Sequence, residues 1–414
     1  MTTTAMDIGQ KELPTGWKWV KLGDVCEVVT GNTPKKADDS FYGGNTPWVK
    51  PSDLDKEMFV SASDEYLSDS GVSQARLLPE GSVLVSCIGN LGKLAIAGVS
   101  LCTNQQINAL VPRRGVLSGF LFFAARTLRP QMERLAANTT VQIVNKTAFS
   151  SIPIPLPPLE EQKRIAGILD EQMAAVEEAK KAAQQRLEAA KALPAAYLRE
   201  VFPSSEDELP AGWEWVKLGD LPIEIGDGNY AEKYPRQSEF LDQGVPFIRA
   251  TNLNNGTVTS DDMRYISSSK HNLLVKGHLK EGDVLIVTRG GIGEVALVPN
   301  EHEDSNINAQ LVRLRSDRQF LNERFLFFSL QSTPTVTQVA NLLTGSALKQ
   351  LPIRNLKQVS LSLPPLEDQN RIAYELDDKL AGIKLAEASI QQELDTIEAM
   401  PAALLRKAFS GGLV

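Results

Sequence analysis

Two groups of polar and basic side chains, one in each half of the chain, have the chemistry needed to contact nucleic acid. Lys and Arg can bond phosphates or guanine, whereas Asn and Gln can bond adenine through paired donor and acceptor groups. We predict as contact residues Lys35, Lys36, Lys50, Ser52, Asn90, Lys93, Gln142 and Lys146 in the first half, and Asn229, Arg249, Thr251, Asn252, Arg289, Lys349 and Arg354 in the second. Each set as a whole is a stronger prediction of nucleic-acid contact than any single residue in it, because Lys and Arg are common on every protein surface.

The sequence lacks the motifs of enzymes that act on DNA. A methyltransferase that flips a base would carry a cofactor-binding glycine loop and an Asn/Asp-Pro-Pro-aromatic motif, and neither is visible. Gly89-Asn-Leu-Gly92 and Gly290-Gly-Ile-Gly293 each lie between two short apolar runs, so we expect hairpin turns there. A Gly-x-x-x-x-Gly-Lys-Ser/Thr phosphate loop is absent as well. We therefore predict no catalytic residue and no bound cofactor in this chain.

Metal and thiol chemistry are not predicted either. The residues concerned are His271, His278 and His302, and Cys26, Cys87 and Cys102. The histidines have no metal-type spacing and no counterparts in the other half of the chain. Three cysteines without CxxC spacing favour buried thiols over a disulfide framework or a zinc site.

Two further polar groups are predicted to be structural. We interpret Asp53, Asp55, Lys56 and Glu57 as a solvated loop and not as a nuclease cluster. Four amides lie beside apolar residues at matching places in the two halves and are predicted to support the fold: Asn104, Gln106, Asn308 and Gln310.

The net charge of −8 is unevenly distributed. Residues 31–150 carry 12 Lys and Arg against 10 Asp and Glu, and residues 226–358 carry 15 against 14. The helical stretch 366–407 carries 5 against 9. A chain of this charge should not hold DNA tightly by counterion release alone, and would need a basic partner.

The chain contains an internal repeat. Leu13-Pro-Thr-Gly-Trp17-Lys-Trp19-Val-Lys-Leu-Gly-Asp24 returns at Leu209–Asp220, and Pro157-Pro-Leu-Glu-Glu-Gln162-Lys-Arg164-Ile-Ala166 returns at Pro364–Ala373. Between these ends the two halves share a pattern of short apolar runs that end at glycine turns, which predicts a mixed α/β domain in each half.

A long helix is predicted after each domain. Prolines such as Pro158 and Pro365 precede it, and no further proline occurs until Pro194 or Pro401, so each helix should span about 35 residues, or about 50 Å. The second helix has the heptad series Leu376, Ile383, Ile390, Ile397 and Leu404, and the first has Leu169, Val176, Ala183, Ala190 and Tyr197. Small residues in one series and large ones in the other favour a helix pair over two helices that each pack on their own domain.

These repeated motifs resemble the DNA-specificity subunits of type I restriction-modification systems. The resemblance also includes Gly31-Asn32-Thr33-Pro34, the segment Pro47–Leu54, and the helix ends Leu198–Phe202 and Leu405–Gly411. It implies an α+β fold, with two mixed α/β target recognition domains in a pseudo-two-fold duplicated chain, joined by two long helices that form an antiparallel coiled coil.

The resemblance also implies function. Each recognition domain would read one half of a bipartite DNA site, and the helix pair would set the gap and dock two methylation subunits, beside which restriction subunits can act. S-adenosylmethionine, ATP and Mg would belong to these partners. We predict Gln162, Arg164, Gln369 and Arg371 as partner-binding residues, although they could instead cap the helices. A protein-binding adaptor and a standalone methyltransferase or nuclease remain alternative functions.

The predicted boundaries follow the repeats. They are an N-terminal tail at 1–12, the first recognition domain at 13–156, the first spacer helix at 157–202, a hinge at 203–208, the second domain at 209–363, the second helix at 364–409 and a C-terminal tail at 410–414. The polar N-terminus and the lack of a long apolar run predict a cytoplasmic protein.

Overall fold

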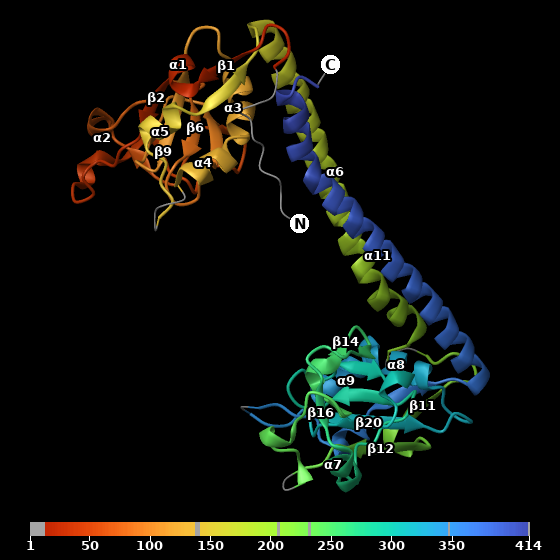
Figure 1. Cartoon of the computed structure of the whole chain (residues 1–414). Helices are drawn as coiled ribbons and strands as arrows, with labels where there is room; N and C mark the ends of the chain where they lie inside the picture. The colour runs from red at the N-terminus through yellow and green to blue at the C-terminus, as the bar shows by residue number, and fades with distance from the viewer. Residues whose placement is uncertain (1–12, 137–140, 205–207, 231–232, 347, 413–414) are drawn as a thin grey trace. The chain divides into compact units, whose positions relative to one another are not determined.

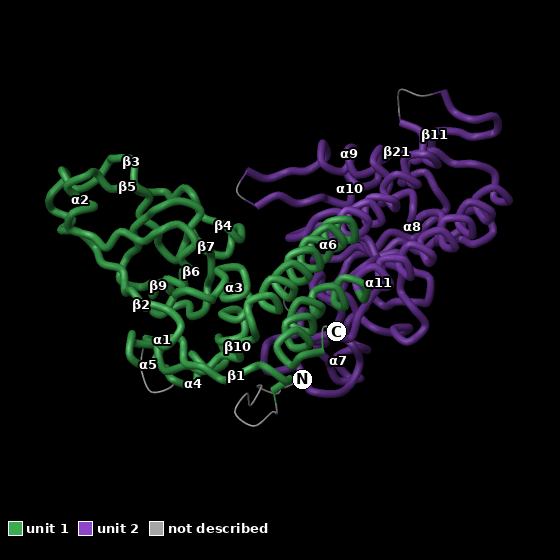
Figure 2. Tube along the Cα trace, turned by 90° about the horizontal axis from the view of Figure 1, so that it is seen from above, with its two compact units in different colours: residues 1–184, 392–414 green, residues 185–391 purple. Residues whose placement is uncertain are grey.

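The chain divides into two compact units, each with one copy of the repeat (Figure 2). The structure is a computed structural model that describes residues 13–136, 141–204, 208–230, 233–346 and 348–412. One unit comprises residues 1–184 and 392–414, and the other comprises residues 185–391. The predicted N-terminal tail and the centre of the predicted hinge, residues 205–207, lie outside the described residues.

The first unit is built on a five-stranded sheet with the strand order β2-β9-β6-β7-β4, of which β2, β9 and β6 are labelled in Figure 1. A separate three-stranded sheet has the order β5-β3-β8, and β1 pairs antiparallel with β10. The elements are β1 Lys18–Lys21, α1 Leu22–Val25, β2 Cys26–Thr30, η1 Asp39–Phe41, β3 Tyr42–Val49, β4 Phe59–Val60, β5 Tyr66–Leu67, α2 Asp69–Gln74, β6 Val83–Ser86, β7 Leu94–Ala97, β8 Cys102–Thr103, β9 Ile107–Pro112, α3 Ser118–Arg126, α4 Arg129–Ala136, α5 Lys146–Ser150 and β10 Pro153–Leu156.

The second unit repeats this topology. Its main sheet has the order β12-β20-β17-β18-β15-β14, its small sheet is β16-β13-β19, and β11 pairs with β21. The elements are β11 Glu214–Lys217, η2 Leu218–Asp220, β12 Ile223–Asp227, η4 Gln237–Glu239, β13 Val245–Ile248, η5 Ala250–Asn252, β14 Leu253–Asn254, β15 Thr257–Val258, β16 Arg264–Ile266, α7 Ser268–Leu273, β17 Val284–Val287, β18 Val295–Leu297, η6 Asn300–His302, β19 Asn306–Ile307, β20 Leu311–Ser316, α8 Glu323–Gln331, α9 Thr333–Asn341, α10 Ile353–Leu356 and β21 Ser360–Leu363.

The core of each unit lies on both faces of its central strand. Val83 of β6 packs with Phe120 and Phe123 of α3. Leu84 points to the opposite face, as successive residues of a strand do, and packs with Leu54. A strand buried on both faces reads as a continuous apolar run, which is why the sequence pattern identified it. Burying one such Phe side chain stabilises the fold by about 1.5 to 3 kcal/mol.

The two long helices exceed the predicted length of about 35 residues. Helix α6 runs from Leu159 to Val201 over 43 residues, and α11 runs from Leu366 to Phe409 over 44. Both continue past an internal proline, Pro194 or Pro401, at which the length estimate had stopped, and both lie within the predicted segments 157–202 and 364–409. A proline removes one helical N–H donor, but the apolar residues that follow are anchored on a domain, and this packing outweighs the local cost.

The helices pair antiparallel, as predicted. In the first unit the end of α11 lies against the start of α6, where Lys180 Nζ is 2.8 Å from Glu398 Oε1. In the second unit the end of α6 lies against the start of α11, where Lys379 Nζ is 4.6 Å from the Tyr197 ring centroid. Most heptad positions are buried in both helices, including Ala183, whereas Tyr197 and Leu404 near the helix ends are half-buried.

Each long helix ends on the domain that it does not follow in the chain. Phe409, at the end of α11, packs on Phe120 of the first unit with ring centroids 5.5 Å apart. Phe202, just after α6, packs in the same way on Phe325 of the second unit, at 5.4 Å. The repeated Phe at each helix end therefore has a structural explanation.

Smaller predictions from the sequence are also confirmed. The glycine segments 89–92 and 290–293 connect antiparallel strands, β6 with β7 and β17 with β18. Cys26, Cys87 and Cys102 are free and buried, and burial raises the pKa of the first two thiols to about 12 and that of Cys102 to about 11. Among the described residues, no helix is both long and apolar enough to cross a membrane.

Candidate nucleic-acid interface

Backbone hydrogen bonds bring five loops of the first unit to one end of its main sheet. We call this surface the first loop end; it comprises residues 31–36, 50–57, 87–93, 103–106 and 141–142. The bonds, between 2.7 and 3.1 Å long, run from Gly31 N to Ile107 O, Asn32 N to Thr103 O, Asn104 N to Val49 O, Cys87 N to Gln106 O and Gly89 N to Gln142 O.

Most predicted contact residues of the first half meet at this loop end. Those on it are Lys35, Lys36, Lys50, Ser52, Asn90, Lys93 and Gln142, and Lys146 begins α5 shortly afterwards. Most of them are exposed, whereas Lys50 and Lys93 are half-buried. The ammonium of Lys50 lies 4.8 Å from the Trp48 ring centroid and pairs with Glu65.

The second unit forms an equivalent surface, the second loop end, from residues 228–230, 249–252, 288–294, 308–310 and 348–351. Its bonds, 2.8 to 3.1 Å long, include Asn308 N to Ile248 O, Ile307 N to Gly277 O, Thr288 N to Gln310 O and Leu351 N to Thr288 O. It carries the predicted residues Asn229, Arg249, Thr251, Asn252, Arg289 and Lys349, with Arg354 nearby in α10.

Arg289 is the best-placed basic residue of the second loop end. It is exposed, and its guanidinium carbon lies 5.3 Å from the ring centroid of Tyr230. The Tyr230 hydroxyl donates a hydrogen bond to Ala309 O at 3.4 Å. Burial and the neighbouring Asp227 carboxylate raise the pKa of Tyr230, so its ring stays neutral and can support the Arg289 cation. The sequence analysis missed Tyr230, which no motif marks.

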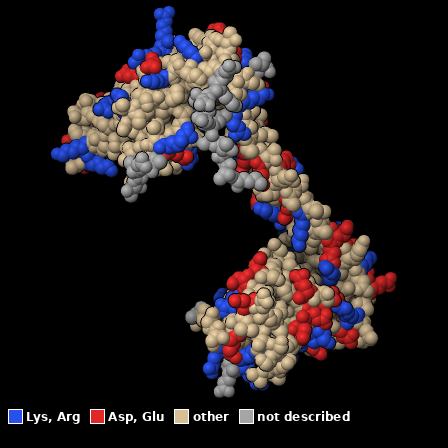
Figure 3. Space-filling model, in the orientation of Figure 1, with Lys and Arg blue, Asp and Glu red and all other residues tan. Residues whose placement is uncertain are grey.

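The two loop ends share a backbone but differ in side chains at equivalent positions. An isolated antiparallel bridge pairs Ile88 with Ile143 in the first copy and Arg289 with Gln350 at the corresponding place in the second. One scaffold therefore presents an apolar pair at one loop end and a polar pair at the other. Figure 3 shows Lys and Arg at several separate places on the visible face of each unit. This agrees with the nearly equal numbers of basic and acidic residues in segments 31–150 and 226–358.

Two predicted contact residues are buried and require correction. Asn252 is 0% exposed, and its amide accepts from Arg249 N at 3.0 Å and donates to Asp261 O at 2.8 Å. Asn229 is 7% exposed and donates to Lys276 O at 2.7 Å. Both amides are used by the fold, so a base edge cannot reach them.

Asp53 shows that the loop predicted to be solvated is also structural. Its carboxylate is buried and accepts from Lys50 N at 2.8 Å, the role that Asn252 has in the second copy. Asp55 accepts from Leu94 N at 2.9 Å. The solvated-loop prediction was therefore wrong for Asp53, whereas Asp55, Lys56 and Glu57 are exposed as predicted.

The four amides predicted to be structural are confirmed. Asn104 donates to the Gln106 side chain at 2.9 Å and accepts from Gln106 N at 3.1 Å. Asn308 and Gln310 form the same two bonds at 2.8 and 3.1 Å. These pairs brace the segment on which each loop end converges.

Arg249 is partly committed within the protein. Its side chain is 16% exposed and pairs with Asp262 at 2.8 Å, which lowers the pKa of that carboxyl group. It would have to exchange this partner to contact DNA. Thr251, two positions later, is exposed and has no such requirement.

Gln162 and Gln369 make equivalent sets of buried hydrogen bonds at the starts of the long helices. Gln162 Oε1 accepts from Leu117 N, and its Nε2 donates to Gly115 O and Pro157 O, all at 3.0 Å. Gln369 makes the equivalent bonds with Asn322, Phe320 and Pro364. Each side chain is 1% exposed. The prediction that these two glutamines bind a partner is therefore corrected to a structural role, because no polar atom is left for another protein.

Arg164 and Arg371, each two residues after one of these glutamines, are exposed on the surface. Arg164 bonds Glu161 at 2.6 and 2.8 Å, which lowers the pKa of that carboxyl group. Arg371 bonds Asp368 and Glu375 at 2.9 and 3.1 Å. Glu161 and Asp368 lie in the first turns of α6 and α11, where negative charge is favoured.

We predict that replacing Gln162 lowers the stability of the chain strongly and that replacing Arg164 hardly changes it. Gln162→Ala leaves one buried N–H and two carbonyls without a partner, so we expect a loss of about 2 to 4 kcal/mol in the free energy of unfolding. Arg164→Ala removes an exposed ion pair with Glu161 and should change it by less than about 0.5 kcal/mol. Urea unfolding of the full chain, followed by circular dichroism, measures both. Wild-type stability of Gln162→Ala combined with loss of methylation-subunit binding would restore the partner role.

Three other side chains come together although the sequence gave no sign of it. His271, His278 and Asp304 place their potential ligand atoms within 4.8 Å of one another. The sequence spacing of the histidines predicted no metal-binding arrangement. In the structure, His271 and His278 nevertheless lie close enough to share a ligand set with Asp304.

Comparison with known proteins agrees with this duplicated architecture. The family profile described as "Type I restriction modification DNA specificity domain" matches residues 14–189 and 210–396, once for each copy of the repeat. The chain belongs to this family. The resemblance inferred from the repeated motifs is thereby confirmed, and the chain is the specificity subunit of a type I system, with two target recognition domains.

Relatives of this specificity subunit match along nearly its whole length. The type I restriction enzyme MjaIX specificity subunit of Methanocaldococcus jannaschii is 25% identical over 382 residues, which cover 87% of this chain and 85% of the relative. The EcoKI specificity subunit of Escherichia coli is 24% identical over 422 residues, or 97% and 90%.

Solved structures share the fold of the specificity subunit. The crystal structure of the HsdS subunit from Thermoanaerobacter tengcongensis has a TM-score of 0.69 at 25% identity and covers 99% of this chain and 100% of that one. A chain from a structural study of complex assembly and conformational transition in a type I system has a TM-score of 0.78 at 24% identity, with 98% and 100% covered.

Proposed function

We propose that each target recognition domain reads one half of a bipartite, asymmetric DNA site through its loop end. The observation that carries the proposal is the pair of equivalent scaffolds with different side chains, Ile88 and Ile143 in one copy and Arg289 and Gln350 in the other. A chain with two identical surfaces would favour a symmetric site, whereas two different surfaces favour two unrelated half-sites.

The exposed residues divide between phosphate and base contact. Lys35, Lys36 and Lys349 are flexible point charges suited to phosphates, which position the protein. Asn90 and Gln142 can bond adenine, and Arg289 can bond guanine through two parallel hydrogen bonds. Lys50, Ser52, Lys93, Lys146, Arg249, Thr251 and Arg354 complete the proposed DNA contacts.

The helix pair, in this proposal, sets the gap between the half-sites and docks two methylation subunits. Arg164 and Arg371 are the residues of the original partner set that remain exposed for docking. The near-neutral recognition domains would give weak counterion release, so basic partners would supply most phosphate contacts. Restriction subunits would join the same assembly.

The specificity subunit itself would not catalyse a reaction. S-adenosylmethionine for methyl transfer, and ATP and Mg for the restriction step, would be held by the partner subunits. This follows from the missing cofactor and phosphate motifs in the sequence and from the loop ends, whose Asp and Asn side chains hold backbone groups instead of a reaction centre.

Reconstitution with labelled S-adenosylmethionine tests this function. We expect the purified chain alone, and the methylation subunit alone, to transfer no methyl groups to DNA. The two together should methylate adenines at a split site. Methyl transfer by the isolated chain would disprove the non-catalytic role, and methylation at a continuous site would disprove the two-half reading.

A further inference from the structure

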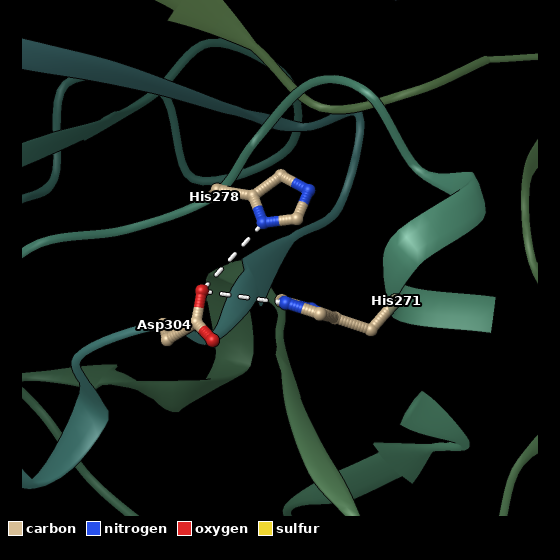
Figure 4. Close-up of side chains that lie close together, drawn as sticks. All are labelled: His271, His278 and Asp304. Carbon is tan, nitrogen blue, oxygen red and sulfur yellow. Dashed lines mark ion pairs between the residues drawn. The ribbon is translucent and has the colours of Figure 1, made fainter. Parts of the chain in front are cut away.

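A cluster of three side chains in the second recognition domain has the arrangement of a metal site (Figure 4). His271 lies in the last turn of α7, His278 in the loop that follows, and Asp304 between η6 and β19. His271 Nε2 is 3.3 Å from Asp304 Oδ1, and His278 Nδ1 is 3.7 Å from the same oxygen. Figure 4 shows both rings directed at the carboxylate.

Hydrogen bonds on the far sides of the rings fix both tautomers. His278 Nε2 bonds the Leu274 carbonyl, which can only accept, so Nε2 carries the proton. His271 Nδ1 lies 2.5 Å from Asn306 Oδ1, also an acceptor, so Nδ1 carries the proton there. A neutral imidazole has one N–H, and the other nitrogen of each ring therefore presents a lone pair toward Asp304.

Three ligand atoms that face one another in this way can hold a cation between them. We propose that His271, His278 and Asp304 bind a divalent first-row transition metal ion, with Zn²⁺ as the best match to two imidazoles and one carboxylate. Atoms bound tetrahedrally at 2.0 to 2.1 Å lie about 3.4 Å from each other. The two nitrogen–oxygen distances of 3.3 and 3.7 Å are close to this value, and all three atoms lie within 4.8 Å of one another.

The surroundings of the cluster match those of ligands that are held in place for a metal. Metal-binding histidines usually donate their second N–H to a carbonyl, an amide or a carboxylate, as both rings do here. The backbone is braced as well, since Asp304 N donates to Leu279 O at 2.9 Å and Leu279 N to Ser305 O at 3.0 Å. Asp304 has a left-handed φ of 58°, a conformation that Asp adopts more readily than most residues.

Solvent can reach the proposed ion from one side. The side chain of His271 is 7% exposed, that of His278 34% and that of Asp304 77%. An ion can therefore enter over Asp304 and keep a water as its fourth ligand.

The ion would join two loops that support the second loop end. It would tie the connection between α7 and β17 to the loop before β19, where Ile307 N bonds Gly277 O. The chain has three histidines, all in the second half, so this support would act on one recognition domain only. The inference does not depend on what the loop end binds.

Zinc titration of the full-length, untagged, chelator-treated chain tests the site. We expect one Zn²⁺ per chain, a rise in melting temperature on binding, and visible absorption of a tetrahedral ion when Co²⁺ is used. Asp304→Asn should weaken Zn²⁺ binding at least tenfold and keep the fold, because Asn also tolerates a left-handed backbone. His278→Gln removes a different ligand and should weaken binding as much.

Glu301→Gln is the matched control, since it removes a charge from the same segment outside the cluster. It should bind Zn²⁺ like the wild type, and the circular dichroism of all variants should match. The site is contradicted if the wild type binds no Zn²⁺, or if Asp304→Asn and His278→Gln bind it as tightly as Glu301→Gln does.

Discussion

Replacing Gly31 with alanine should destabilise the first recognition domain by about 3 kcal/mol or more. A Cβ at this position would lie closer than 3.0 Å to the carbonyl oxygens of Thr103 and Asn104. These are backbone atoms, and Gly31 cannot move away because its N–H bonds Ile107 O at 3.0 Å. Urea unfolding measures the stability, and reconstituted methylation at the split site should fall with it.

Gly167 provides the matched control on helix α6. No atom lies within 4 Å of a Cβ built on it, and alanine suits a helix better than glycine. Gly167→Ala should therefore stabilise the chain by about 0.5 to 1 kcal/mol and leave methylation unchanged. Wild-type stability of Gly31→Ala would show that the loops do not converge on segment 103–106 as closely as described.

Lengthening both long helices by one turn should lengthen the gap in the methylated site. Four residues added near Ala190 in α6, with a matching insertion near Glu387 in α11, supply about 6 Å and keep the buried face almost in phase. The Tyr197–Lys379 contact sets the antiparallel pairing that makes these positions match. With DNA rising about 3.4 Å per base pair, the gap should grow by about one or two base pairs.

Sequencing of methylated DNA from cells that carry the variant measures the gap and the bases together. A variant with alanine at Glu188 and Lys191, which form an exposed pair at 3.0 Å, controls for altered surface without altered length and should keep the gap. New bases at an unchanged gap would show that the helices do not act as a ruler.

The architecture could be predicted from the sequence because it rests on repetition and periodicity. The second copy of Trp17-Lys-Trp19 identified the duplication, and the heptad series through Ile383 and Ile390 identified the seam between the helices. Both signals are local, since they need only residues that are neighbours on one helix or strand. The helix length was harder to estimate, because α6 continues past Pro194 to the point where Phe202 packs on Phe325.

The site was predicted only in outline, because burial depends on contacts far away in the chain. Asn252 and Thr251 are adjacent and equally polar, yet one is enclosed and the other exposed. Gln162 and Arg164 were assigned the same role, but Gln162 faces a loop 45 residues away. The cluster of His271, His278 and Asp304 likewise arises from a pairing of two loops that no local pattern encodes.

Exchange of one recognition domain tests the central claim most directly. Residues 31–150 would be replaced by the equivalent segment of a relative with a different target, and the methylated sites would be sequenced in cells that supply the methylation subunit. We predict new bases in one half-site and unchanged bases in the other half-site. A change in both half-sites would contradict independent reading by two recognition domains, as would an unchanged site.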